Sequence, residues 1–106
     1  MAAYFVCTMS IHDRDIYLKY TALTPMTVSR HGGKFLTRGE PVATVEGGPT
    51  FEERMVLIEF PSKEKALAWY NDAEYQNASQ FRRLASKGRM LLQEGGSNTA
   101  NPDPKL

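Results

Sequence analysis

Hydrophobic and polar residues alternate with a period of two near the start of the chain, from residue 3 to residue 11. Successive side chains of a β-strand point to opposite faces of a sheet, so this alternation predicts a first strand. The stretch 54–60 is the most hydrophobic of the chain and predicts another strand, with apolar residues on both faces. The first strand places Phe5, Cys7, Met9 and Ile11 on one face; the strand at 54–60 places Val56, Ile58 and Phe60 on one face and Met55 and Leu57 on the other.

The spacing of apolar residues becomes helical after the first strand. A helix is expected to begin near Asp13, and its apolar stripe consists of Ile16, Tyr20 and Leu23. Pro25 fits poorly inside a helix, because it lacks an amide hydrogen and its ring clashes with the preceding turn. We therefore expect this helix to end at residue 23. A second, offset turn should then run from Thr24 to about residue 31, before Gly32 stops it in the left-handed conformation.

Two further strands and a second helical region complete the predicted elements. A strand at 34–38 is expected to break near Pro41 and to resume at 42–46, and a short last strand is expected at 89–94. The second helical region begins after a cap at Ser62, restarts at residues 71–72 and is expected to end at Gly88. Trp69 and Tyr70 lie on its apolar side, which indicates core packing rather than ligand binding.

The predicted order is β-α-β-β-α-β, the ferredoxin-like arrangement of the α+β class, with a four-stranded antiparallel sheet and helices on one face. A chain of 106 residues is long enough for one domain and too short for two, so residues 1–95 are expected to form a single domain. Residues 96–106 are poor in apolar side chains and are expected to be a disordered tail.

The apolar residues on both faces of the strands predict a dimer. Two helical regions can cover only one face of a four-stranded sheet. The other face would then be an exposed apolar patch, which monomers rarely tolerate. We therefore expect a homodimer in which the sheet faces of two copies pack together.

Composition narrows the possible partners and the compartment. The formal net charge is +1, and Lys and Arg are spread along the chain, so neither nucleic acid nor an anionic membrane is an expected partner. No apolar run approaches the roughly 18 residues of a membrane span. The single cysteine, Cys7, excludes an internal disulfide and predicts a reducing, cytoplasmic location.

A series of short motifs in a fixed order resembles a small bacterial family, the domain-of-unknown-function family thirteen-thirty, within the dimeric α/β-barrel superfamily. The resemblance runs from about residue 4 to about residue 95. It rests on Gly32-Gly33-Lys34-Phe35-Leu36, Arg38-Gly39, Glu46-Gly47, Glu59-Phe60-Pro61-Ser62, Ala68-Trp69-Tyr70, Glu74-Tyr75-Gln76, Arg82 and Glu94-Gly95.

The resemblance implies a ferredoxin-like protomer and a dimer whose two sheets form a barrel, but it assigns no reaction. The wider superfamily includes cofactor-free monooxygenases, isomerases, cyclases, haem-binding degraders and ligand domains of transcription factors, so a shared fold is weak support for any one activity. Two classes stay open. One is a cofactor-independent enzyme for proton transfer, isomerisation or oxygenation of an anionic or carbonyl-bearing substrate. The other is a non-catalytic binding, structural or stress-associated homodimer.

Two residues are candidates for a catalytic base. Glu59 lies inside an apolar strand, where a carboxylate is costly unless it is paired. It is either a general base with a raised pKa or the partner of Arg38 or Arg54 in an ion pair at the dimer interface. His31 precedes the stop at Gly32 and is either an acid–base group or a helix-end residue that interacts with the helix dipole.

The candidates for substrate binding are Arg38, Arg54, Tyr75 and Arg82. Arg38 and Arg54 come from the ends of neighbouring strands, where guanidinium groups suit a carboxylate or enolate. Alternatively, they form ion pairs at the interface or are solvated residues at the strand ends. Tyr75 and Arg82 are seven positions apart and share a helix face, which either contacts ligand or simply covers the sheet. The histidines and Cys7 show no metal-ligand spacing, so neither a metal nor a cofactor is expected.

Overall fold

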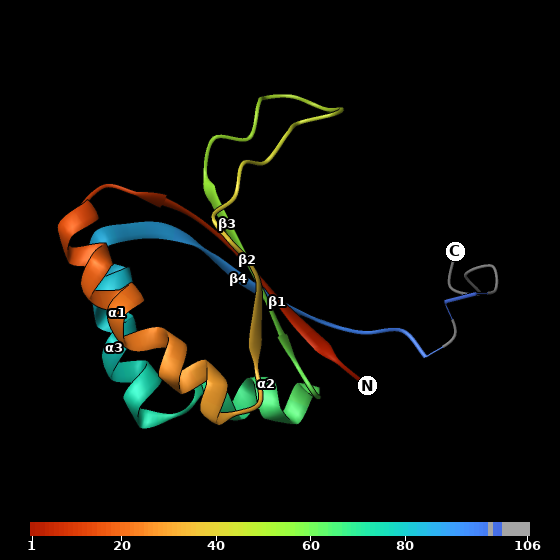
Figure 1. Cartoon of the computed structure of the whole chain (residues 1–106). Coiled ribbons are helices and arrows are strands. Elements are labelled where there is room, and N and C mark those ends of the chain that lie inside the picture. The colour runs from red at the N-terminus through yellow and green to blue at the C-terminus, as the bar shows by residue number, and fades with distance from the viewer. Residues whose placement is uncertain (98, 101–106) are drawn as a thin grey trace.

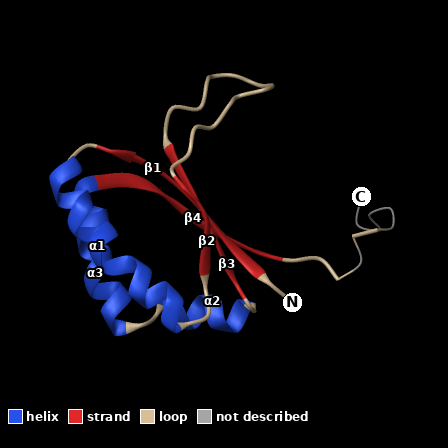
Figure 2. Cartoon of the chain, viewed as in Figure 1, coloured by secondary structure: helices blue, strands red, loops and turns tan. Residues whose placement is uncertain are grey.

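The computed structural model describes residues 1–97, 99 and 100, and within them a four-stranded antiparallel sheet carries three helices on one face (Figures 1 and 2). The predicted β-α-β-β-α-β order is confirmed, with the second helical region divided in two. The elements are β1 (Ala3–Ile11), α1 (Arg14–Arg30), β2 (Lys34–Arg38), β3 (Arg54–Phe60), α2 (Lys63–Tyr70), α3 (Ala73–Ala85) and β4 (Ser86–Glu94).

The spatial order of the strands is β2-β3-β1-β4, and every neighbouring pair is antiparallel. β1 therefore lies inside the sheet, between β3 and β4. Its register places Cys7 opposite both Val56 of β3 and Met90 of β4, all on the face toward the helices. The predicted split of apolar residues between the two faces of β1 and β3 is confirmed.

The prediction that the first helix ends before Pro25 is wrong, because α1 continues through it to Arg30. Long-range contacts hold the second half of α1 in place. The side chain of Thr27 is buried, and its hydroxyl oxygen accepts the indole N–H of Trp69 at 3.0 Å. Val28, one residue further on, is also buried. The packing of this half offsets the missing hydrogen bond at Pro25. Gly32 follows with φ of 75°, as predicted for the stop.

The prediction that the strand after Arg38 resumes at 42–46 is also wrong. β2 ends at Arg38, and residues 39–53 form a long loop that projects away from the sheet (Figure 1). Gly39 turns the chain with φ of 92°, and Pro41 has no amide hydrogen to give to a neighbouring strand. Inside the loop, the backbone N–H of Phe51 donates to the Thr44 hydroxyl at 2.8 Å.

The last strand begins earlier than predicted, because β4 starts at Ser86, directly after α3. Gly88 does not end a helix; it lies within β4, opposite Met9 of β1. A Cβ atom at this position would overlap the carbonyl oxygen of Thr8. The glycine is therefore explained by the close approach of the two strands, not by a helix end.

The core lies between the sheet and the helices and is rich in aromatic rings. Trp69 is fully buried and packs against Phe5, Phe60 and Tyr75, with ring centroids 5.3, 5.3 and 4.0 Å away. These contacts agree with the prediction that Trp69 packs in the core. Ser62 accepts the backbone N–H of Lys65 at 3.1 Å and caps α2 as predicted.

The opposite face of the sheet carries no helix. Val6 lies there between Leu57 of β3 and Leu91 of β4, and the Leu91 side chain is 48% exposed. These three residues, here called the open-face row, form an apolar band across three strands. None of the helices in the part of the chain that the structure describes is long and apolar enough to cross a bilayer. The predicted tail at 96–106 falls largely on residues 98 and 101–106, which lie outside the described ranges.

Candidate functional site

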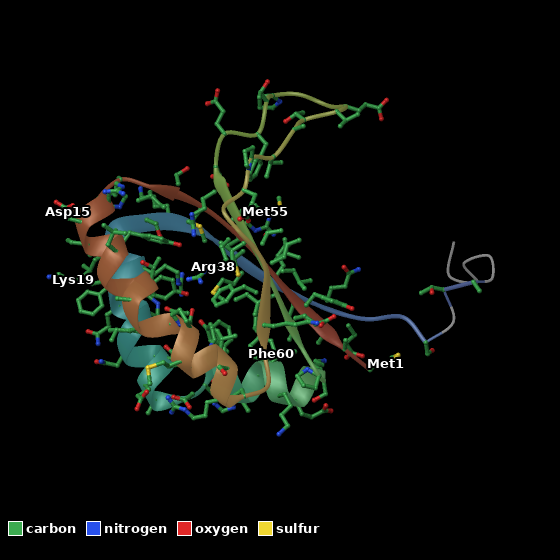
Figure 3. The ribbon with its side chains drawn as sticks, in the orientation of Figure 1. Met1, Asp15, Lys19, Arg38, Met55 and Phe60 are labelled. Atoms are coloured by element: carbon green, nitrogen blue, oxygen red, sulfur yellow. The ribbon has the colours of Figure 1, made fainter. Side chains whose placement is uncertain are left out.

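A cavity of about 30 Å³ lies between the sheet and the helices. Polar side chains from both layers line it, against an apolar floor. Figure 3 shows Arg38 reaching into the space between the strands and α1. The lining residues are Cys7, Met9, Tyr17, Tyr20, Thr21, Thr24, Phe35, Arg38, Arg54, Val56, Ile58, Arg82 and Met90.

Three of the lining residues are arginines: Arg38 from β2, Arg54 from β3 and Arg82 from α3. Among the described residues, no carboxylate lies within ion-pair distance of any of them. The Nε atoms of Arg54 and Arg82 are buried and have no hydrogen-bond partner. The exposed carboxylate of Glu40 accepts the backbone N–H of Arg38 rather than its guanidinium. The cavity therefore gathers three guanidinium groups, and the charge of Glu40, which Arg54 and Arg38 help to stabilise, lies outside its lining.

A β-bulge explains why Arg38 faces the cavity. In a regular strand, Lys34 and Arg38 would share one face, because they are four positions apart. The register between β2 and β3 shifts between Phe35 and Thr37, so that one extra residue enters β2. Lys34 consequently lies opposite Glu59 on the open face, whereas Arg38 lies opposite Val56 on the face toward the helices. Bulges commonly redirect a side chain in this way.

Aromatic rings support each guanidinium group. The Cζ atom of Arg38 is 4.4 Å from the ring centroid of Phe35. Arg54 lies 5.6 Å from the ring of Tyr17, and Arg82 lies 5.8 Å from the ring of Tyr20. Cation–π contacts of this kind recover part of the hydration that the charges lose. Arg54 and Arg82 also lie within hydrogen-bonding reach of the Tyr17 and Tyr75 hydroxyls, whereas their buried Nε atoms have no partner.

Buried tyrosine hydroxyls lie next to the arginines. The hydroxyl of Tyr20 is 2.9 Å from that of Tyr75, which is fully buried behind the cavity wall. The Tyr17 hydroxyl donates to the sulfur of Met9 at 3.8 Å. Burial raises the pKa of Tyr17, Tyr20 and Tyr75 above the usual tyrosine value. All three therefore stay protonated at neutral pH and act as hydrogen-bond donors, not as bases.

The cavity contains no ready base. Burial raises the pKa of the Cys7 thiol to about 12, so the thiol is neutral and unreactive at physiological pH. The described residues that line the cavity include neither a carboxylate nor a histidine. No group of three or more His, Cys, Asp or Glu in that same part of the chain is placed to hold a metal ion.

The structure places Glu59 away from the cavity, on the open face of the sheet. Its carboxylate lies 3.2 Å from the ammonium group of Lys34, and its side chain is 27% exposed. The alternative in which Glu59 is ion-paired therefore agrees with the structure, although its partner is Lys34 and not Arg38 or Arg54. Glu59 and the three arginines belong to opposite faces of the sheet.

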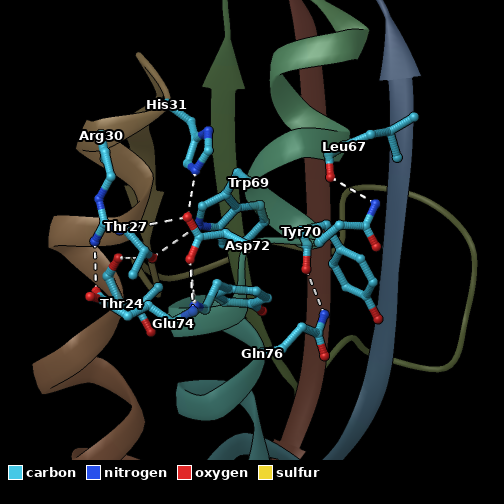
Figure 4. Close-up of polar contacts among 12 residues, drawn as sticks. Thr24, Thr27, Arg30, His31, Leu67, Trp69, Tyr70, Asp72, Glu74 and Gln76 are labelled. Atoms are coloured by element: carbon cyan, nitrogen blue, oxygen red, sulfur yellow. Dashed lines mark hydrogen bonds and ion pairs between the residues drawn. The ribbon is translucent and has the colours of Figure 1, made fainter.

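His31 also lies outside the cavity, at the junction of α1 and α3 (Figure 4). Its Nε2 atom is 2.8 Å from the carboxylate of Asp72, and Arg30 forms ion pairs with Asp72 at 3.6 Å and Glu74 at 2.6 Å. The hydrogen bond with His31 lowers the pKa of Asp72. These contacts fasten the end of one helix to the start of another.

The structure brings together four of the six candidates. Arg38, Arg54 and Arg82 line the cavity, and Tyr75 supports its wall through Tyr20. Sequence reasoning missed the hydroxyl-bearing face of α1. That face was visible as hydroxyl groups at helical spacing along one stripe, at Tyr17, Tyr20, Thr21 and Thr24.

Comparison with protein families gives a match over most of the chain. The family described as "Domain of unknown function (DUF1330)" matches residues 2–96. A search of curated proteins gives no match.

Solved structures with a similar fold come from several bacteria. A protein of unknown function from Rhodopseudomonas palustris has a TM-score of 0.73 and 17% identity, with 92% of this chain and 84% of that chain covered. SnoaB, a cofactor-independent oxygenase from Streptomyces nogalater, has a TM-score of 0.55 and 7% identity, with 94% of this chain and 98% of that chain covered. A dimeric protein of unknown function and ferredoxin-like fold from Bacteroides fragilis has a TM-score of 0.51 and 11% identity, with 89% of this chain and 96% of that chain covered. At these identities the similarity establishes the fold.

Proposed function

Because the chain belongs to the DUF1330 family, whose function is unassigned, we propose a function from its cavity: it binds a small organic anion, a carboxylate or an enolate. The observation that carries the proposal is the set of three arginines that face one cavity without a carboxylate partner. Arg38 is exposed, but Arg54 and Arg82 are half-buried, and each has a buried Nε atom without a hydrogen-bond partner. A buried donor without a partner is costly, and a bound anion would remove that cost.

The type of donor favours a carboxylate or enolate over a larger polyanion. Guanidinium groups donate two parallel hydrogen bonds to a planar pair of oxygens. The Tyr17 hydroxyl donates to the Met9 sulfur at 3.8 Å, and by turning from this weak acceptor to a bound carboxylate it would supply a further donor without adding charge. The cavity of about 30 Å³ has room for a carboxylate-sized group but not for a phosphate chain.

A catalytic version of this function is the second candidate. Arg38, Arg54 and Arg82 would stabilise negative charge on an enolate, as preorganised donors do in enzyme sites. With no base in the cavity, the substrate would have to be acidic enough to lose its proton to water or buffer. The similar fold of SnoaB, a cofactor-independent oxygenase, supports this candidate as an analogy. Neither Glu59 nor His31 takes part in it within one protomer.

The proposal also includes a homodimer in the cytoplasm. The open-face row is the apolar surface that a second copy would cover, and the Bacteroides fragilis protein of similar fold is dimeric. The free, buried thiol of Cys7 suits a reducing compartment.

Titration calorimetry of the full-length protein tests anion binding, with acetate and benzoate compared with the neutral acetamide and benzamide. We expect binding of the carboxylates only. Arg54→Met and Arg82→Met each remove charged hydrogen bonds and should weaken binding roughly ten- to hundredfold. The control is Arg83→Met, because Arg83 neighbours Arg82 on α3 but does not line the cavity. Equal affinity in wild type and both cavity variants would refute the proposal.

A further inference from the structure

A second hollow, here called the mouth groove, adjoins the cavity. Its volume is about 510 Å³, and it shares Tyr17, Thr21, Arg38 and Arg54 with the cavity. The remaining residues that line it are Ile11, Arg14 and Leu18. Because the two hollows have Arg38 and Arg54 in common, these two residues lie where the groove meets the cavity.

The small volume of the cavity and the larger volume of the mouth groove imply that a ligand larger than acetate would occupy both. One water molecule needs roughly 10–15 Å³ of such free volume, so a cavity of about 30 Å³ holds a group about the size of a carboxylate. The body of any ligand larger than acetate must therefore lie outside the cavity. The mouth groove has room for it.

The walls of the mouth groove indicate what that body is. Ile11 at the end of β1 is 37% exposed, and Leu18 on α1 is 45% exposed. Apolar side chains on both sides of a groove favour a hydrocarbon body over a charged one. Arg14 is the remaining cation of the groove; it is exposed, and an exposed charge contributes little to binding.

Another hollow of about 430 Å³ also includes Arg82 in its lining, together with Leu67 and Leu92. It shares only Arg82 and Met90 with the cavity, against four residues for the mouth groove. The mouth groove is thus the better continuation of the cavity, because it also includes two of the three arginines.

Building on the anion-binding function proposed above, we infer that the ligand is a monocarboxylate with an apolar body, of the fatty-acid or aryl-carboxylate class. Its carboxylate lies among Arg38, Arg54 and Arg82. Its hydrocarbon body lies in the mouth groove, against Ile11 and Leu18.

A chain-length series tests this inference. The full-length protein is titrated by calorimetry with acetate, butanoate, hexanoate and octanoate, and with adipate as a second acid of hexanoate length. We expect the affinity to rise roughly fourfold for each CH₂ group that the groove covers, because each removes apolar surface from water. Hexanoate should bind more tightly than adipate.

Two matched variants locate the hydrocarbon body. Leu18→Ser should flatten the dependence on chain length while acetate affinity stays the same, whereas Leu67→Ser in the other hollow should leave the series unchanged. Both side chains are about equally exposed, at 45% and 40%, so folding should tolerate either change.

The possible results separate the two proposals. Acetate binding that depends on Arg54, without any gain along the series, overturns the inference and leaves the proposed function in place. Tighter binding of adipate than of hexanoate, or a series flattened by Leu67→Ser instead, also overturns the inference. Failure of every carboxylate to bind overturns both the inference and the proposed function.

Discussion

The side chain of Asp72 both caps α3 and contacts the end of α1. One of its carboxylate oxygens caps α3 by accepting the backbone N–H groups of Glu74 and Tyr75 at 2.8 and 3.2 Å. The other lies 2.8 Å from His31, at the end of α1. The first contact needs only an oxygen, but the second gains from the negative charge. The charge of Asp72 therefore stabilises the junction of the two helices.

The pH dependence of stability follows from this charge. Because the pKa of Asp72 is lowered in the folded protein, mainly by His31, its contribution is complete above the usual aspartate pKa of about 3.9 and is lost as the pH falls through the lower folded value. Asp72→Asn keeps the cap and removes the charge. Urea unfolding from pH 7 to pH 3 should show lower stability at pH 7 and a smaller loss toward acid than in wild type.

The control for this prediction is Asp15→Asn, because Asp15 is an exposed carboxylate in the first turn of α1. We expect its acid profile to match that of the wild type. An acid profile of Asp72→Asn that also matched the wild type would contradict the role given to the junction.

The loop between β2 and β3 controls the site at the scale of elements. The bulge in β2 turns Arg38 toward the cavity, and Gly39 then leaves β2 with a positive φ. A Cβ atom at residue 39 would overlap the guanidinium group of Arg54. The exit of the chain from β2 and the position of Arg54 are thus coupled through one glycine.

Gly39→Ala should lower both stability and anion affinity. Its positive φ makes an alanine unfavourable by about 1–2 kcal/mol, and the new methyl group displaces Arg54 from the cavity. Gly47→Ala is the matched control, because Gly47 has a similar φ of 85° but open space around its Cβ position. Thermal melts should show a loss in both variants, whereas calorimetry should show weaker binding in Gly39→Ala alone.

At the scale of the whole molecule, the two faces of the sheet differ in what covers them. The face toward the helices contains the core and the cavity. The other face presents Val6, Leu57 and Leu91 in one row, with Lys34 and Glu59 paired beside it. An apolar row bordered by charged side chains is typical of a subunit interface.

Leu91→Lys should convert the expected dimer to a monomer, because it places a charge in the middle of the apolar contact. Sedimentation velocity at micromolar concentration would measure this change. Leu84→Lys on α3 is the control, since Leu84 is 65% exposed and lies on the opposite side of the molecule from the open-face row. A monomeric wild type, or a dimeric Leu91→Lys variant, would argue against this interface.

Sequence patterns predicted what depends on neighbours along the chain and missed what depends on contacts across it. The strand at 54–60 and the cap at Ser62 follow from local alternation and capping, and both were correct. The continuation of α1 through Pro25 depends on Thr27 and Trp69, which are 42 positions apart. The requirement for glycine at position 88 comes from the close approach of the neighbouring strand β1.

The same distinction applies to the candidate site. Arg38 and Arg54 could be chosen from the sequence because guanidinium groups at strand ends suit anions, and Arg82 because it shares a helix face with Tyr75. Their meeting in one cavity depends on the bulge in β2, which no alternation pattern revealed. Glu59 is ion-paired, as one of the two alternatives expected, but its partner is Lys34, because the bulge turns Arg38 to the other face of the sheet.

The unpaired arginines have a consequence for the thermodynamics of the empty protein. Three like charges held close together repel one another, so the unliganded form is less stable than the same fold with its cavity filled. Folding and occupancy are therefore linked by mass action: a ligand at a hundred times its dissociation constant would add about 2.7 kcal/mol to the free energy of unfolding. The melting temperature of this small domain thus becomes a direct measure of whether its cavity is occupied.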